Sequence, residues 1–430
     1  MKSSIRKSSD SDRAAVDWRR VPAFRKVSEK DWNDWRWQMR NCIKTVDALQ
    51  KVAELDASEV ADLRRCLEKF RMAITPYYAA LMDAKDRRCP VRQLAIPSAS
   101  ELKDDISDLD DPLHEDVDSP VPGLTHRYPD RVLLLITHIC SMNCRHCTRR
   151  RLVGFQDGDM SRAHVEAALA YIRKTPQIRD VLISGGDPFV LAEDKLEWIL
   201  QGLRAIPHVE IIRIGTRTPV VMPMRITDEL VAMLRRYHPI YVNTHFNHPK
   251  EVTPEAQAAC AQLADAGIPL GNQTVLLKGV NDCPSKMRRL VHDLLRIRVK
   301  PYYIYQCDLS KGISHFRTSI AKGMEIMENL RGHTTGMAVP TFVVDAPGGG
   351  GKIPVMPNYL LSQSDRRLVL RNYEGVLTTY TQPENAYSEP CACEYCRDPR
   401  YHTREGVGSL LAGEKLSLEP QGLKRRQRHA

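Results

Sequence analysis

Short apolar runs alternate with amphipathic stretches of helical period through the middle of the chain. The runs are rich in leucine and β-branched residues, which predicts strands buried on both faces at 132–137, 181–184, 211–215, 241–244, 270–276 and 302–305. Between these strands the pattern predicts helices at 161–174, 194–205, 227–237, 254–266 and 285–297. This alternation predicts an α/β fold with a parallel sheet curled into a full or partial (β/α)6 barrel.

The segments that flank this pattern have a different character. Ser28 followed by Asp31 is a helix N-capping signal, and a second helix is expected from about Ser58, so the N-terminal region is helical. Residues 101–118 hold nine acidic residues and one lysine, which predicts a solvated surface connection. We therefore divide the chain into a helical N-terminal region with an acidic connection (1–118), a barrel core (119–355) and a C-terminal extension (356–430).

Composition and charge exclude several classes of protein. With 430 residues, 42% of them hydrophobic and 27% charged, the chain is that of an ordinary globular protein. No apolar run approaches the ~20 residues of a membrane-spanning helix, and residues 1–12 lack an apolar signal core, so we expect a cytoplasmic protein without a membrane partner. Most of the net charge of +10 lies at the two ends, and aromatic residues make up 6%, so we expect no nucleic-acid partner.

Six of the twelve cysteines fall into two clusters, and the first directly follows the first predicted strand. Cys140, Cys144 and Cys147 have the spacing CxxxCxxC. Three thiolates in one loop can hold three irons of a [4Fe-4S] cluster and leave the fourth iron open for another ligand. A structural zinc ion completed by His138 or His146 is the alternative.

Polar residues and glycines gather where the predicted strands end. They are Ser184, Gly185, Gly186, Asp187, His245, Gln273, Asp308 and Asp345. Ligands bind at the carboxyl ends of parallel strands, so we expect these residues to surround one site. A further apolar strand is predicted at 342–344, and it leads into Asp345 and a loop with four glycines followed by Lys352. Ala346 and Ile353 break the phosphate-binding P-loop pattern in this loop. A lysine in such a loop can instead form a Schiff base with pyridoxal phosphate.

Six motifs along the chain resemble those of the lysine 2,3-aminomutase family. They are CSMNCRHCTRRR, SGGDP, NTHFNHP, YYIYQCDLS, VVDAPGGGGKIPVMPNY and a terminal CxCxxC. This family belongs to the radical S-adenosylmethionine superfamily, so the resemblance implies a partial barrel of radical SAM type with a [4Fe-4S] cluster on Cys140, Cys144 and Cys147. It also implies S-adenosylmethionine binding at the strand ends and a pyridoxal phosphate Schiff base on Lys352. The residues implied for S-adenosylmethionine are Ser184, Gly185, Gly186, Asp187, His245 and Gln273. Those implied for the phosphate and ring of pyridoxal phosphate are Arg127, Tyr128 and Arg131.

The same resemblance implies the substrate and the reaction. Arg149 matches the arginine that binds the substrate carboxylate, and Asp308 and Asp345 match two aspartates that hold the distal ammonium of lysine. The expected activity is that of an isomerase that moves the amino group of L-lysine from C2 to C3 and forms L-β-lysine. Arginine is the alternative substrate, and a zinc-dependent nucleic-acid-binding protein is the alternative from another class. A flavodoxin or ferredoxin is the expected electron donor.

The second cysteine cluster consists of Cys391, Cys393 and Cys396 in the C-terminal extension. Three thiolates in a short loop predict a zinc site, with a second iron-sulfur cluster as the alternative. By the resemblance, Cys283 is the fourth zinc ligand, and His402 is the runner-up. The resemblance also implies that zinc joins subunits of a domain-swapped dimer, or of a tetramer built from such dimers.

Overall fold

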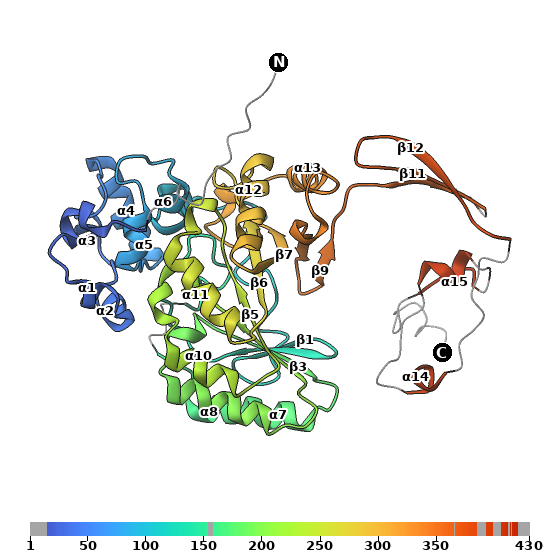
Figure 1. The fold of residues 1–430 in the computed structure, drawn as a ribbon, viewed down its shortest axis with the longest axis horizontal. Helices are drawn as coiled ribbons and strands as arrows, with labels where there is room; N and C mark the ends of the chain where they lie inside the picture. Colours follow the sequence, from blue (N-terminus) through green and yellow to red (C-terminus); the bar gives the residue numbers. More distant parts are fainter. Residues whose placement is uncertain are drawn as a thin grey trace, which may run out of the picture. The chain divides into compact units, whose positions relative to one another are not determined.

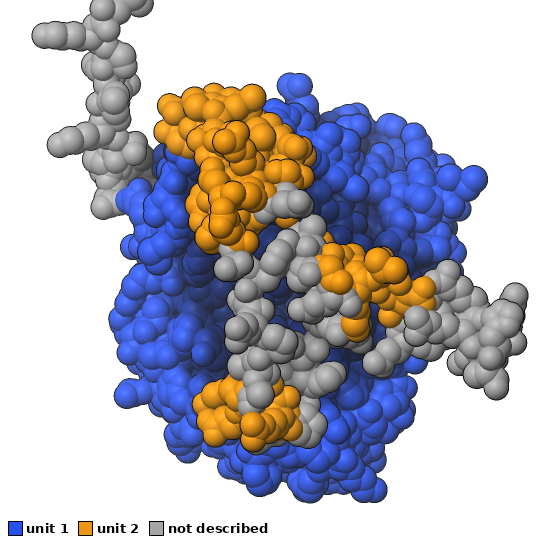
Figure 2. All heavy atoms as spheres, turned by 90° about the vertical axis from the view of Figure 1, so that its right-hand side faces the viewer, with its two compact units in different colours: residues 1–357 blue, residues 358–430 orange. Residues whose placement is uncertain are grey.

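The computed structural model describes residues 15–153, 158–364, 366–384, 393–398, 406–411, 413 and 415–419. The chain separates into two compact units, residues 1–357 and 358–430, which Figure 2 shows in blue and orange. Within the described ranges, no helix has the length and apolar character needed to cross a lipid bilayer.

Short helices form the N-terminal part of the first unit (Figure 1). They are η2 (Trp18–Arg20), η3 (Pro22–Phe24), α1 (Glu29–Trp32), α2 (Trp35–Arg40), α3 (Val46–Leu49), α4 (Ala57–Lys69), α5 (Pro76–Leu81), α6 (Pro90–Ala95) and η4 (Ala99–Leu102). The predicted cap at Ser28 is confirmed, because its hydroxyl accepts a hydrogen bond from the Asp31 backbone N–H at 3.1 Å. The second predicted helix begins at Ala57, since Asp56 forms a capping box with Glu59.

A nine-stranded sheet follows, with its strands in sequential order from β1 to β9. The strands are β1 (Leu124–Tyr128), β2 (Arg131–Leu135), β3 (Asp180–Ser184), β4 (Ile211–Gly215), β5 (Ile240–Thr244), β6 (Leu270–Leu276), β7 (Val299–Gln306), β8 (Thr341–Ala346) and β9 (Gly351–Pro354). Strands β2 to β8 are parallel, whereas β1 and β9 are antiparallel to their neighbours at the two edges. The two edge strands are not paired with each other, so the barrel is partial, as the sequence predicts.

Helices cross over between the parallel strands and cover one face of the sheet, as Figure 1 shows. The longer ones are α7 (Arg162–Lys174), α8 (Glu193–Arg204), α10 (Asp228–Arg235), α11 (Pro254–Asp265), α12 (Pro284–Arg296) and α13 (Ile320–Leu330). The first five agree with the predicted helices to within two residues at each end. The short α9 (Thr218–Val221) follows β4, and the 3-10 turns are η5 (Pro188–Val190), η6 (Pro223–Arg225), η7 (Pro249–Glu251), η8 (Ser314–Phe316) and η9 (Gly336–Ala338).

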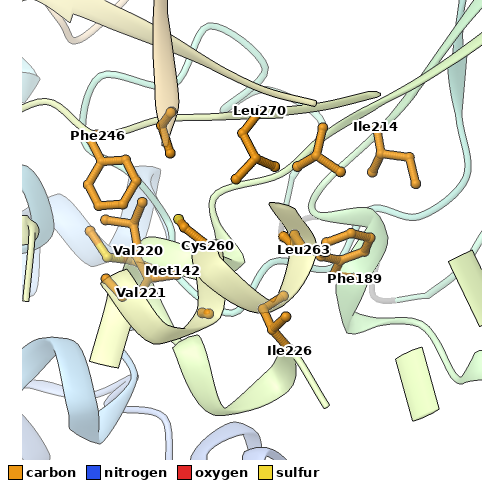
Figure 3. Packing of buried hydrophobic residues seen from close by; sticks show 14 of the residues in the cluster. Met142, Phe189, Ile214, Val220, Val221, Ile226, Phe246, Cys260, Leu263 and Leu270 are labelled. Carbon is orange, nitrogen blue, oxygen red and sulfur yellow. The ribbon is translucent and has the colours of Figure 1, made fainter. Parts of the chain in front are cut away.

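Most strands are fully buried on one face and only partly on the other, in contrast to the prediction that both faces are buried. In β3, Val181 and Ile183 are fully buried, whereas Leu182 between them is half-buried and lines a cavity. Outward-facing residues pack against the helices; Figure 3 shows Cys260 and Leu263 of α11 near Leu270 of β6. The inward face is incompletely buried because the barrel is hollow, and this hollow contains the candidate site.

Much of the acidic connection is exposed, as its composition predicts, but two of its carboxylates are buried. Glu101 is 1% exposed and binds the guanidinium groups of Arg145 and Arg150. Glu115 is also buried, and it pairs with Arg149. The segment therefore packs against the arginines of the first cysteine motif, because buried carboxylates are stable when cations pair with them.

The second unit contains a three-stranded antiparallel sheet in the order β10-β11-β12. Its elements are β10 (Leu360–Gln363), β11 (Arg367–Arg371), β12 (Leu377–Thr381), α14 (Glu394–Arg397) and α15 (Val407–Leu411). The side chains of β10 and β12 are exposed, so the sheet alone does not build a core.

Candidate active site

One cavity of about 710 Å³ in the first unit contains nearly all the residues that the sequence predicts as functional. Its lining includes Arg127, Tyr128, Arg131, Cys140, Cys144, Cys147, Arg149, Ser184, Gly185, Gly186, Asp187, His245, Gln273, Asp308, Asp345 and Lys352. Of the predicted site residues in this unit, only Cys283 is outside the lining. The structure thus brings the predicted residues together, while their individual roles stay predictions.

The loop of the first cysteine motif is held by its own backbone. The Asn143 N–H donates to the Ala73 carbonyl at 2.9 Å, and the Arg145 N–H donates to the Leu94 carbonyl at 3.1 Å. Burial raises the pKa of Cys140 and of Cys147, and the neighbouring cysteines raise both further. Crowded thiols of this kind ionise when a cationic metal group binds them.

This donor set fits an iron-sulfur cluster better than a single zinc ion. Among the described residues, no three histidine, cysteine, aspartate or glutamate side chains converge on a point where one metal ion could bind. His146 lies between two of the cysteines, and its buried Nδ1 has no hydrogen-bond partner. A four-iron cluster uses three more widely spaced thiolates, so the donors present are compatible with it.

Glycines at the end of β3 place a backbone turn directly against the segment that precedes the cysteines. A Cβ on Gly185 would lie 2.3 Å from the Thr137 carbonyl oxygen, and one on Gly186 would lie 2.0 Å from that of Ile139. Only glycine fits at either position. The two glycines therefore allow the protein backbone itself to approach this turn closely.

Asp187 is occupied by protein partners at the end of β4. Its carboxylate accepts hydrogen bonds from the hydroxyl of Thr216 at 2.6 Å and from the backbone N–H of Arg217 at 2.8 Å. Burial raises its pKa, although these donors oppose the rise. Asp187 therefore links the SGGD turn of β3 to the loop after β4, and its predicted contact with S-adenosylmethionine stays a prediction.

A different part of the cavity is lined by the β8–β9 hairpin. Asp345 and Lys352 are opposite each other in its register, and Lys352 Nζ lies 3.4 Å from Asp345 Oδ1. The Lys352 N–H donates to the hydroxyl of Tyr128 at 3.1 Å. Burial, with a contribution from Asp345, raises the pKa of Asp308 to about 7, although the Lys352 ammonium opposes the rise. Two carboxylates and one amine thus face the same space.

The predicted carboxylate-binding residue, Arg149, is oriented by Glu115. Arg149 Nε and Nη2 donate to the Glu115 carboxylate at 2.7–3.1 Å, and Nη1 lies 3.4 Å from Ser184 Oγ. Burial alone raises the pKa of Glu115, but the Arg149 guanidinium holds it below the ordinary value. Sequence reasoning missed Glu115 because it was assigned to the solvated connection.

The residues predicted for pyridoxal phosphate line the cavity beside the hairpin. Arg127 Nε donates to Asp118 at 2.8 Å, and the Arg131 guanidinium lies over the Tyr128 ring at 3.8 Å from its centre. These contacts leave two cations and a phenol at one part of the cavity wall, which is a suitable environment for a phosphate.

The histidine predicted to bind S-adenosylmethionine is held neutral by its surroundings. His245 Nδ1 lies 3.1 Å from the Gln273 carbonyl oxygen, and burial together with Arg217 lowers the pKa of His245 to about 4. Arg217 and its partner Glu251 were also missed by the sequence analysis. A signal for Arg217 was available, because it follows the predicted strand 211–215 by two residues. Several of the other predicted site residues occupy the same kind of position at the ends of their strands.

The predicted zinc ligands are only partly described. Cys391 lies outside the described residues. In the second unit, Cys393 and Cys396 have their sulfur atoms 3.6 Å apart, and in the first unit Cys283 precedes α12 as its N-cap. These positions leave the zinc site a prediction.

Comparison with known proteins assigns the family. A sequence model described as "Radical SAM superfamily" matches residues 134–291, and one described as "Lysine-2,3-aminomutase" matches residues 327–430. The L-lysine 2,3-aminomutase of Clostridium subterminale is 60% identical over 411 residues, which cover 96% of this chain and 99% of that protein. This chain belongs to the lysine 2,3-aminomutase family.

Other members of the lysine 2,3-aminomutase family show its breadth. The L-lysine 2,3-aminomutase of Bacillus subtilis (strain 168) is 52% identical, over 96% of this chain and 88% of that protein. The glutamate 2,3-aminomutase of Clostridioides difficile (strain 630) is 51% identical, over 81% of this chain and 82% of that protein. The family resemblance and the radical SAM fold predicted from the sequence are both confirmed. Because members with different named substrates are similar to this chain, the substrate has to be argued from the site.

Proposed function

We propose that this chain is a radical SAM, pyridoxal phosphate-dependent aminomutase that converts L-lysine to L-β-lysine. The observation that carries the proposal is that a single cavity brings together Arg149, the carboxylates of Asp308 and Asp345, and Lys352, along with the three cysteines of the first motif. L-Lysine presents the complementary set, namely a carboxylate, a distal ammonium and an α-amine. When bound, the iron-sulfur cluster with S-adenosylmethionine supplies a carbon radical, and pyridoxal phosphate supplies a π system beside the substrate.

The charged side chains define which end of the substrate goes where. Arg149, held by Glu115, retains Nη1 for the substrate carboxylate. Asp308 and Asp345 receive the distal ammonium, and Lys352 Nζ, 3.4 Å from Asp345 in the hairpin, is the amine that holds pyridoxal phosphate. Arg127, Arg131 and Tyr128 hold its phosphate and ring.

The first cysteine motif and the strand ends supply the remaining binding groups. Cys140, Cys144 and Cys147 ligate the [4Fe-4S] cluster. Ser184, Gly185, Gly186, Asp187, His245 and Gln273 are the residues assigned to S-adenosylmethionine. Their placement in the same cavity as Lys352 supports a shared reaction space.

The proposal extends to parts of the protein that support the reaction. We assign zinc to Cys283, Cys391, Cys393 and Cys396, and we propose that this metal joins subunits in a domain-swapped dimer or a tetramer. A flavodoxin or ferredoxin supplies the electron. Three expectations from the sequence are kept in this proposal. They are the domain boundaries near residues 118 and 355, a cytoplasmic location and the lack of a nucleic-acid partner.

Anaerobic turnover tests the proposed reaction. The protein is reconstituted with iron, sulfide and pyridoxal phosphate, and is then given S-adenosylmethionine and a reductant with lysine, arginine or glutamate in separate reactions. Mass spectrometry of derivatised products is expected to show β-lysine. The similar proteins do not favour the arginine alternative. Formation of β-arginine or β-glutamate in place of β-lysine would overturn the proposed substrate. Formation of 5′-deoxyadenosine with no β-amino acid would overturn the aminomutase assignment.

A further inference from the structure

Arg217 is a buried cation in direct contact with the first cysteine motif, and the proposed reaction gives it no role. It lies in the loop after β4 and is 7% exposed. Its Nη1 lies 2.7 Å from Cys144 Sγ and donates to that sulfur. A guanidinium stays charged in proteins, so this hydrogen bond comes from a permanent cation.

Glu251 and Tyr78 hold the other side of this guanidinium. Arg217 Nη2 donates to Glu251 Oε1 at 2.6 Å and lies 3.3 Å from the Tyr78 hydroxyl. The Tyr78 hydroxyl itself donates to the same Glu251 oxygen at 2.7 Å. Glu251 is fully buried and also accepts the backbone N–H groups of Asn247 and His248 at 2.5 and 2.9 Å.

The backbone of Arg217 is fixed as well. Its N–H donates to Asp187, which is part of the SGGD turn packed against the segment before the cysteines. The guanidinium is thus restrained at Nη1 and Nη2, and the residue is also restrained at its main-chain N–H. A contact restrained in this way is maintained when the charge of its sulfur partner changes.

We propose that Arg217 is a positioning residue that raises the reduction potential of the iron-sulfur cluster through its hydrogen bond to the Cys144 thiolate. The inference rests on the proposed function, because it takes Cys144 as a cluster ligand. One-electron reduction adds one negative charge to the cluster, and a hydrogen bond from a cation to a ligand sulfur stabilises that extra charge. In a buried site with a low dielectric constant the stabilisation is larger than in water.

A purely structural role is the competing explanation, and the chain offers a matched control for it. Arg225 is fully buried, and its guanidinium donates to the backbone carbonyls of Phe189 and Leu191 and to Glu193 at 2.6–2.9 Å. None of these partners is a cysteine. Removing the Arg225–Glu193 pair therefore tests the loss of a buried arginine and its carboxylate partner without loss of a contact to the first cysteine motif.

The main variant is Arg217→Met combined with Glu251→Gln, since the single change would leave a buried carboxylate without its cation. The control combines Arg225→Met with Glu193→Gln. Each protein is reconstituted with iron and sulfide under anaerobic conditions, and its iron content is measured. A redox titration with dithionite and mediators, followed by electron paramagnetic resonance of the reduced cluster, then gives the midpoint potential.

We expect the R217M/E251Q protein to be at least about tenfold harder to reduce than wild type, which is a downward shift of about 59 mV for one electron. The control is expected to keep the wild-type potential. A fully loaded R217M/E251Q protein with an unchanged potential overturns the proposal, and so does a control that shifts equally.

If the double variant does not load iron, Arg217→Lys decides the question. A lysine ammonium keeps the charge but cannot span both Cys144 and Glu251, so a smaller downward shift is expected, and an unchanged potential overturns the proposal. Lack of a reduced-cluster signal in the wild-type protein would instead refute the cluster assignment and with it the proposed function.

Discussion

Replacing Asp308 with Asn is expected to stabilise the substrate-free protein at alkaline pH. Asp308 follows β7 and faces Asp345 and Lys352 in the cavity. Burial, with a contribution from Asp345, raises the pKa of Asp308 from 3.8 to about 7. Asn has nearly the shape of a protonated Asp and never ionises, so the variant removes the cost of placing a charge there.

The size and sign of the effect follow from the two pKa values. Below pH 3.8 the group is protonated in both folded and unfolded chains, so it contributes no pH dependence. Between pH 3.8 and about 7 the unfolded chain releases the proton while the folded chain keeps it, and wild-type stability falls as the pH rises. At about 1.36 kcal/mol per pKa unit, the full cost of ionisation above pH 7 is about 4 kcal/mol, and at pH 5 it is about 2 kcal/mol. The substrate ammonium offsets this cost on binding.

Urea unfolding of the protein without pyridoxal phosphate and substrate, between pH 4 and 8.5, measures the effect. All five tryptophans lie between residues 18 and 198, so intrinsic fluorescence reports the unit that contains Asp308. The difference in unfolding free energy between D308N and wild type is expected to grow with pH.

Asp293→Asn is the matched control, because Asp293 is buried but paired with Arg289 at 2.9 Å, and losing that carboxylate is expected to destabilise the protein. A D308N protein that is less stable than wild type at pH 8, or equally affected at every pH, would refute the reasoning.

Three further predictions concern neighbouring groups. Glu115→Gln removes the anion that orients Arg149. Hydrogen bonds to charged groups contribute about 1.5–3 kcal/mol, so the KM for lysine is expected to rise about 10- to 100-fold. An unchanged KM in steady-state kinetics would contradict this prediction. Lys352→Ala is expected to abolish the Schiff-base absorption band and the covalent attachment of pyridoxal phosphate after borohydride reduction. Retention of either would exclude Lys352 as the residue that binds pyridoxal phosphate covalently. Cys283→Ser is expected to lower the zinc content of the purified protein without changing its iron content, and equal zinc in elemental analysis would remove Cys283 from the zinc site.

The order of strands and helices could be predicted because hydrophobic periodicity is local information. Each strand from β2 to β7 lies within two to three residues of its predicted position, and the strand ends meet in one cavity, as expected for a parallel sheet. Burial on the inward face could not be predicted in the same way. Leu182 is as apolar as its buried neighbours, and it is half-buried only because the sheet curls around a hollow.

The acidic connection shows why a local charge count fails. Nine acidic residues in eighteen positions predict solvent exposure, yet the arginines of CSMNCRHCTRRR, some 34 to 49 residues later, require partners of opposite charge. Glu101 binds Arg145 and Arg150, and Glu115 binds Arg149, so these arginines neutralise part of the acidic excess across the fold. Composition within a window cannot reveal this pairing, but the presence of both excesses in one chain could have suggested it.

This pairing also affects how the site accepts its substrate. Before lysine binds, Arg149 is already neutralised by Glu115, and Lys352 is paired with Asp345. In the proposed binding mode, a substrate carboxylate joins a guanidinium that one carboxylate already fixes, while a substrate ammonium places a further cation beside Asp308. The first contact is available to any amino-acid substrate, whereas the second offsets the cost of ionising a buried acid. A neutral or acidic side chain gains the first contact only, so discrimination in favour of a cationic substrate arises mainly at Asp308.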